Sequence, residues 1–300
     1  MDMKRTSILA VALLLGALPV SAGSADALPR NGKLAFLSNR RVFSSTAQGE
    51  SLTAIIKDRR AGKPAWSPNG RWIAISCGST ETSDAEICIM RPDGSDLKKI
   101  TANEQHDDAP AWSPDGTEIA FVRDGALLTV NVESGEERTI VTPLALPSSP
   151  TWSPDGEYIA ASASAPNSFG DIFVVDVDTG GAVNITNTRR QEYSPDWSPA
   201  GDRIAFQAYE ETAAGGWGIF TRAVDGSDEE RVTSASMFAT VPSWSPNGLK
   251  LTFSGYDDVG RMGSLNGFSS IFTIRSNGSD MRKVFPHNRR GYFAPDWQPR

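Results

Sequence analysis

The sequence of 300 residues is poor in the side chains that most often build metal and nucleophilic sites. It has two cysteines and two histidines, and its 29 basic residues are outnumbered by 36 acidic ones. Because His106 and His287 are the only histidines and fall in loops of different sequence repeats, a metal site built from several imidazoles is excluded, whereas a Ca²⁺ site made of carboxylates is not. The formal net charge of −7 argues against a nucleic-acid partner, because phosphate binding needs clustered positive charge.

The sequence also lacks an apolar segment long enough to cross a membrane. Its most apolar stretch, Ile8–Leu18, is about eleven residues long, whereas a bilayer needs roughly 20. Lys4 and Arg5 precede it and small residues follow, which predicts a signal peptide over residues 1–27, cleaved after Ala27 or, alternatively, after Ala22. We therefore expect an exported protein, periplasmic or secreted, with no transmembrane segment.

A seven-residue motif recurs along the rest of the chain. Pro-Ala-Trp-Ser-Pro-Asn-Gly at residues 64–70 returns as Pro-Ala-Trp-Ser-Pro-Asp-Gly at 110–116 and, with changes, in four further copies. The tryptophans of successive copies are separated by 46, 40, 45, 47 and 53 residues, a period typical of a four-stranded propeller blade. We expect these tryptophans to be structural: Trp66, Trp112, Trp152, Trp197, Trp244 and Trp297.

Each repeat has the same internal order of strands. An apolar run such as Ile73–Ile75 or Ile119–Phe121 begins seven residues after each of the first five tryptophans. The intervening Ser-Pro-Asp/Asn-Gly fits a type I turn, so the tryptophan segment and the apolar run form a hairpin. A third strand, such as Ile172–Val175, and a more polar fourth strand follow, which predicts four-stranded sheets stacked radially into a propeller.

The two ends of the chain predict how the propeller closes. The last copy has only its tryptophan strand, whereas Leu34–Phe36, Val42–Phe43 and Leu52–Ile55 match the other three strands of a repeat. The expected fold is therefore all-β, a six-bladed β-propeller with four antiparallel strands per blade, closed by pairing the C-terminal strand with the N-terminal strands. Within a single domain, 28–300, the expected blades are 295–300 plus 31–57, 64–101, 110–142, 150–186, 195–233 and 242–285.

The repeat Pro-x-Trp-Ser-Pro-Asp-Gly-x-x-Ile-Ala-Phe, followed by Ile-Phe and Asp-Gly-Ser, resembles the TolB-like (PD40, WD40-like) propeller repeat. The resemblance extends from about Asn31 to Arg300 and implies a propeller fold. Similar repeats occur in the propellers of prolyl oligopeptidases and tricorn-type proteases. The sequence departs from those peptidases in having no Gly-x-Ser-x-Gly motif, and from periplasmic TolB in leaving no room before Asn31 for an additional α/β domain.

Long, variable connections predict which face binds a partner. The turns between strands one and two and between three and four are short, whereas the remaining connections, on the opposite face, are longer. Arginine pairs, including Arg59–Arg60, lie six to eight residues before a tryptophan on that loop-rich face, near aromatic residues and near two aspartates beside His106. The predicted ligand-binding residues are Arg189, Arg190, Tyr193, Phe238, Arg289, Arg290, Tyr292, Phe293, Asp107 and Asp108. Alternatively, the arginines bridge blades through neighbouring acids, the aromatic residues fill the central funnel, and the aspartates cap turns.

The two cysteines, Cys77 and Cys88, fall in neighbouring antiparallel strands of one repeat. Export would permit a disulfide between them, and two buried thiols are the alternative. Either arrangement would be structural.

Two classes of function are compatible with these observations. The first is a monomeric binding or scaffolding module of the cell envelope or exterior, with a protein, peptide or glycan ligand, no catalytic residue, and no cofactor except a possible Ca²⁺. The alternative is a hydrolase or lyase whose funnel uses carboxylates and a divalent metal. It requires that at least three carboxylates converge from the set Asp107, Asp108, Glu192, Glu210, Asp257 and Asp258.

Overall fold

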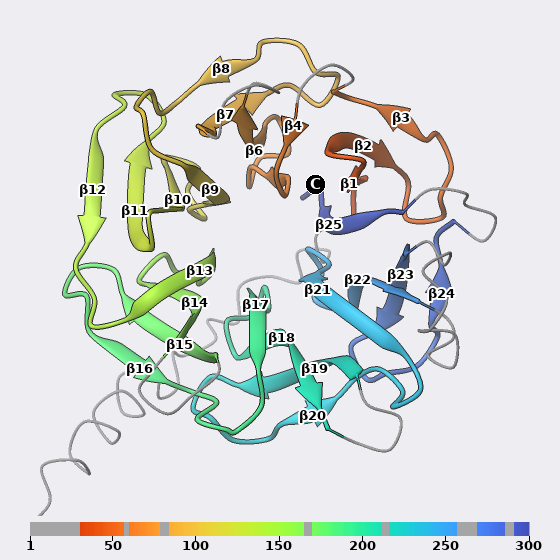
Figure 1. Ribbon diagram of the computed structural model, residues 1–300. Coiled ribbons are helices and arrows are strands. Elements are labelled where there is room, and N and C mark those ends of the chain that lie inside the picture. Colours follow the sequence, from red (N-terminus) through yellow and green to blue (C-terminus); the bar gives the residue numbers. More distant parts are fainter. Residues whose placement is uncertain are drawn as a thin grey trace, which may run out of the picture.

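Six small sheets surround a common axis, as the repeats predict (Figure 1). The computed structural model describes residues 31–56, 60–78, 84–164, 170–211, 216–256, 269–285 and 291–299. Each sheet is antiparallel and provides four strand positions, which confirms a six-bladed β-propeller. The expected signal peptide, Arg289 and Arg290 lie outside the described residues.

The strands of blades 2 to 6 run outward from the axis in chain order, whereas the inner strand of blade 1 is the last strand of the chain. Blade 1 contains β25 (Phe293–Trp297), β1 (Leu34–Ser38), β2 (Arg41–Ser45) and β3 (Thr53–Ala54). In blade 2 the inner position is shared by β4 (Arg60–Ala61) and β5 (Ala65–Trp66), followed by β6 (Ile73–Gly78), β7 (Glu86–Met90) and β8 (Lys98–Lys99). Blade 3 contains β9 (Asp107–Trp112), β10 (Glu118–Arg123), β11 (Ala126–Asn131) and β12 (Glu137–Ile140). Blade 4 contains β13 (Ala145–Trp152), β14 (Tyr158–Ser164), β15 (Asp171–Asp176) and β16 (Ala182–Asn184). Blade 5 contains β17 (Glu192–Trp197), β18 (Arg203–Glu210), β19 (Gly216–Ala223) and β20 (Glu230–Arg231). Blade 6 contains β21 (Phe238–Trp244), β22 (Lys250–Tyr256), β23 (Ser270–Arg275) and β24 (Arg282–Lys283).

The chain closes where β25 joins β1. Trp297 pairs with Leu34, and the Gly32 N–H donates to the Gln298 carbonyl at 2.9 Å. Figure 1 shows the C-terminal strand as the inner strand of the blade that contains the first three strands of the chain. The predicted closure is confirmed, and it pairs the edge of β1 that would otherwise be open.

The Ser-Pro-Asp/Asn-Gly motif forms the turn that its sequence predicts. In blade 3 the Gly116 N–H donates to the Ser113 carbonyl at 2.9 Å, and Ser113 Oγ accepts from the Glu118 N–H at 2.9 Å. Gly116 has a φ of +75°, in the left-handed region that side chains with a Cβ rarely adopt. The motif therefore fixes a hairpin through local contacts, which explains why it could be recognised in sequence.

The core consists of apolar side chains that pack between adjacent blades. In one cluster, Ala160 and Ile172 of blade 4 pack with Ile204 and Phe206 of blade 5. The six repeated tryptophans are buried, each between 3 and 9% exposed, and Trp112 Nε1 donates to the Ala65 carbonyl of the preceding blade at 3.2 Å. Neighbouring blades thus cover apolar surface that a single four-stranded sheet would leave exposed.

The inner strands of blades 1, 3, 4, 5 and 6 each contain a β-bulge. Their pairing shifts register, and the residue three positions before the tryptophan has a positive φ. In blade 5 the N–H of this residue, Ser194, donates to Ser162 Oγ of blade 4 at 3.0 Å. The bulge therefore also links neighbouring blades.

A disulfide joins Cys77 in β6 to Cys88 in β7, with a Cα–Cα distance of 5.8 Å. Both residues belong to the apolar cluster between blades 1 and 2. Over the ranges that the structure describes, no helix is long and apolar enough to cross a membrane.

Candidate functional site

Aromatic side chains gather at the loop-rich edge of blade 5. Tyr209 and Trp217 face each other at the end of β18 and the start of β19, with ring centroids 5.6 Å apart. Tyr193, near the start of β17, lies 5.7 Å from Trp217, centroid to centroid. We call Tyr193, Tyr209 and Trp217 the aromatic platform. Because strands carry all three side chains, their positions are fixed before any ligand arrives.

Blades 6 and 1 place further aromatic residues at corresponding edges. Phe238 faces Tyr256 across β21 and β22, with the rings 5.6 Å apart. Phe293 is 45% exposed, whereas Tyr292 is buried against Phe36. Of the four aromatic residues predicted to bind, Tyr292 thus lies in the interblade core, and Phe293 is the most exposed.

The arginine pair at 189–190 divides between two environments. Arg190 forms ion pairs with Glu192 at 3.0 Å and Glu229 at 2.7 Å, and its guanidinium lies 4.8 Å from the Phe220 ring centroid. Burial is the main reason that the pKa of Glu192 is raised. Arg189 is exposed. The contacts of Arg190 hold the end of blade 5 together, so Arg189 is the exposed member of this pair.

The two predicted aspartates of blade 3 also differ. Asp107 is fully buried and accepts hydrogen bonds from Arg123 at 2.6 and 2.9 Å, which raise the pKa of that guanidinium further. Asp108, the next residue in β9, is exposed and accepts a short hydrogen bond from Ser76. Asp107 is therefore held inside the blade.

Two carboxyl groups that the sequence reasoning missed lie near the propeller axis. Asp196 Oδ2 accepts from the Trp244 N–H at 2.6 Å, and Asp296 Oδ2 accepts from the Trp66 N–H at 2.7 Å. Each carboxylate thus bonds to the backbone of the following blade. We call Asp196 and Asp296 the axial carboxyls.

Burial raises the pKa of both axial carboxyls, that of Asp196 to about 7. The positive charge of Lys63, from blade 2, acts in the opposite direction on both, and Asp296 further raises the pKa of Asp196. The sequence does contain a signal for them. Both stand directly before a repeated tryptophan, where the other copies have alanine, threonine or serine.

The carboxylates named by the enzyme hypothesis can be placed in part. Glu192 and Glu210 share Arg190, whereas Asp107 is held by Arg123 in another blade. Asp257 and Asp258 lie outside the described residues. Among the residues with described positions, no group of three or more His, Cys, Asp or Glu side chains could hold a metal ion.

Six four-stranded blades, buried tryptophans and a blade shared by both chain ends define this protein as a closed β-propeller. The family model described as "TolB beta propeller domain" (PD40) matches residues 126–300. The chain therefore belongs to the TolB-type propeller family, as its repeats predict.

The relatives show how far this likeness extends. The chain is 32% identical over 104 residues to "Uncharacterized peptidase YuxL" of Bacillus subtilis, covering 35% of this chain and 14% of that protein. It is 30% identical over 90 residues to "Protein TolB homolog" of Chlorobium luteolum, covering 30% of this chain and 18% of the relative. The matched segments thus span less than a fifth of either relative. The crystal structure of TolB from Acinetobacter baumannii has the same fold, with a TM-score of 0.74 and 18% identity over 90% of this chain and 67% of that one.

Proposed function

We propose that this protein is an exported binding module that recognises a peptide segment of another protein through the loop-rich face of blades 5, 6 and 1. The aromatic platform carries this proposal. Tyr, Trp and Phe are enriched at protein interfaces, and they lose little conformational entropy when strands already hold them. Tyr209 is 37% exposed, which leaves ring surface for a partner to cover.

The compartment is part of the same proposal. Disulfides persist in oxidising environments outside the cytoplasm, and the chain has one between Cys77 and Cys88. The basic and apolar start of the sequence agrees with export to a periplasm or to the medium. A TolB homologue among the relatives agrees with a role in the cell envelope.

A funnel hydrolase or lyase is the second candidate, and the axial carboxyls are the observation in its favour. The pKa of Asp196, raised to about 7, suits general acid–base chemistry. However, a backbone N–H of the next blade already donates to each axial carboxylate, which is what an interblade clamp requires. The match to the peptidase covers only 14% of that protein, so it supports shared repeats more than shared catalysis.

The experiment compares two tryptophans that lie outside the repeated motif. A partner is first captured from the native envelope with the wild-type protein, identified and purified. Trp217→Ala should then weaken binding about thirtyfold or more, the loss expected for a hot-spot residue worth about 2 kcal/mol. Trp72→Ala is the matched control, because Trp72 directly precedes β6 at the short-turn end of blade 2, 4.0 Å from the guanidinium carbon of Arg91.

Equal affinities of Trp217→Ala and wild type, measured by titration at matched thermal stability, would reject the platform as the binding site. Loss of binding in Trp72→Ala alone would place the site on the short-turn face. Turnover of peptides or polysaccharides that disappears in Asp196→Asn would favour the enzyme.

A further inference from the structure

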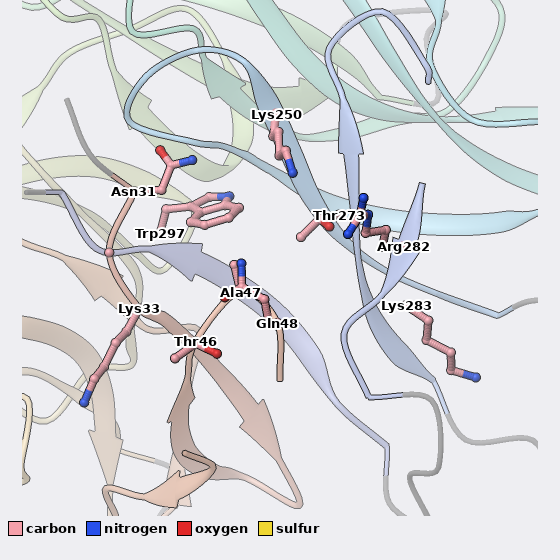
Figure 2. Close-up of a pocket in the computed structure, with 11 residues that line it drawn as sticks. Asn31, Lys33, Thr46, Ala47, Gln48, Lys250, Thr273, Arg282, Lys283 and Trp297 are labelled. Carbon is pink, nitrogen blue, oxygen red and sulfur yellow. The ribbon is translucent and has the colours of Figure 1, made fainter. Parts of the chain in front are cut away.

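A cavity of about 450 Å³ lies on the short-turn face, where blade 6 meets blade 1 (Figure 2). Lys250, Thr273 and Arg282 come from adjacent strands of blade 6, and Trp297 comes from β25. Lys283 of β24 and residues 31–33 and 46–48 of blade 1 complete the lining. Four of the described residues that line the cavity are basic and none is acidic, in a chain whose net charge is −7.

The same place in blade 5 has a different charge pattern. A cavity of about 410 Å³ there is lined by Arg203, Thr221 and Glu230, which occupy the same strand positions as Lys250, Thr273 and Arg282. In blade 5 the threonine thus lies between opposite charges. Arg203 also donates to Thr221 Oγ1 at 3.2 Å and to the Asp228 carbonyl at 2.6 Å, so its guanidinium is largely satisfied within the blade.

Blade 3 repeats the complementary pattern with the signs exchanged. Glu118 stands at the start of its second strand, and Arg138 lies opposite Thr129. Blade 6 departs from both by placing a cation at each position. Figure 2 shows Lys250 and Arg282 on either side of Thr273, whereas the amines of Lys33 and Lys283 point away from Trp297.

Three positively charged side chains of blade 6, from Lys250, Arg275 and Arg282, lie near the carboxylate of Asp280. Lys250 is directly opposite Arg275 in the pairing of β22 with β23, an arrangement that destabilises a sheet. Asp280 forms ion pairs with Arg282 at 3.0 Å and with Arg275 at 3.8 Å. The charge of Lys250 also acts on Asp280, so one carboxylate faces three cations and positive charge remains at the cavity. Departures from a locally favourable pattern are expected at functional sites.

A second, independent observation concerns Asn31. Its Oδ1 atom is buried at the cavity and has no hydrogen-bond partner in the described part of the chain. A buried acceptor without a donor lowers stability, and a donor on a ligand would satisfy it. The cavity thus offers positive charge on one side and a hydrogen-bond acceptor on another. Its volume of about 450 Å³ lies within the range of small-molecule sites.

We propose that this cavity binds a small hydroxylated anion. Its carboxylate or phosphate group lies between Lys250 and Arg282, and a hydroxyl group donates to Asn31 Oδ1. Sugar acids and sugar phosphates share this chemistry. The site lies on the face opposite the aromatic platform and does not depend on the function proposed above.

The test is calorimetric titration of the protein with glucuronate, glucose 6-phosphate, inorganic phosphate and glucose. At least one of the two anionic sugars should bind about tenfold or more tightly than glucose. Arg282→Glu recreates in blade 6 the charge pattern of blade 5. It should reduce affinity for that sugar by about tenfold or more, because it replaces a charge that attracts the anion with one that repels it. Without ligand, this variant should keep the fold of wild type, because Arg282 is 70% exposed and the ion pair with Asp280 that it loses contributes little to stability.

Lys98→Glu is the matched control. Lys98 holds the corresponding position of the fourth strand in blade 2, is exposed, and its replacement changes the net charge by the same amount. It should leave affinity unchanged. The stronger of the two anionic sugars shows whether the site prefers carboxylate or phosphate.

Three results would overturn the proposal. One is that neither anionic sugar binds better than glucose. Another is that Lys98→Glu weakens binding as much as Arg282→Glu, which would indicate diffuse attraction by the surface. The third is that inorganic phosphate binds as tightly as either sugar, which would remove the role given to the hydroxyl group and Asn31.

Discussion

Replacement of the axial carboxyl Asp196 by asparagine should stabilise the protein above neutral pH and have little effect in acid. The carboxyl group ionises near 3.8 in the unfolded chain and near 7 in the folded one, chiefly because of burial. Between these values the folded state keeps a proton that the unfolded state has released. Stability therefore falls as the pH rises through this window, and the fall is complete above the folded pKa.

The shift sets an upper limit on the effect. A difference from 3.8 to about 7, at about 1.36 kcal/mol for each pKa unit, amounts to about 4 kcal/mol. Asparagine keeps an oxygen that can accept from the Trp244 N–H, but it gives up the attraction to Lys63. Part of this effect is already present at about pH 4.5, so we expect Asp196→Asn to gain about 1 to 3 kcal/mol relative to wild type on going from about pH 4.5 to about pH 8.

Urea titrations of both proteins at the two pH values give the required free energies of unfolding. Asp225→Asn is a control in which the pKa shift has the opposite sign, because hydrogen bonds from Ser227 lower the pKa of Asp225 in its short turn. The stability that this carboxylate contributes is present above its unfolded pKa of 3.8 and is lost only in stronger acid, so its replacement should have nearly the same effect at about pH 4.5 as at about pH 8. If the difference between Asp196→Asn and wild type were the same at both pH values, Asp196 would not titrate as a buried acid and the reasoning would be refuted.

Two further predictions concern the scaffold. Deletion of residues 294–300 removes most of β25 and Trp297, which is 3% exposed, so we expect a loss above about 3 kcal/mol or aggregation. An unchanged melting temperature would contradict closure by both chain ends, and deletion of residues 1–27 serves as the comparison. Gly116→Val should cost about 1 to 3 kcal/mol in a denaturant titration. The cause is the φ of +75°, because a Cβ at Gly116 would meet only Pro68 Cδ, at 3.8 Å. Gly116→Asn, whose side chain tolerates the left-handed region, should lose less, and equal losses would mean that backbone strain is not the cause.

The hairpins could be predicted because their determinants are local. Ser113, Gly116 and Glu118 form the turn of blade 3 within six residues, so the same bonds recur wherever the motif recurs. The number of blades followed from counting strands at the two ends, and the pairing of Trp297 with Leu34 bears that count out.

The candidate site was predicted only in outline. Arg189 and Arg190 are adjacent in sequence, yet one is exposed and the other is held by acids that lie up to 39 residues away. Trp217 was overlooked, although it and Trp72 are the two tryptophans outside the repeated motif, which is the signal that could have singled it out.

The sequence alone therefore determined the blades, their strand order and their closure, since these depend on turn chemistry and on a repeated apolar pattern. Only the tertiary structure decided which charged groups meet. Asp296 bonds to Trp66 across 230 residues, and Asn31 reaches the cavity beside Lys250 only because the ring closes. Contacts between blades join residues far apart in the chain, so their partners are set by the geometry of the closed ring, which no local pattern encodes.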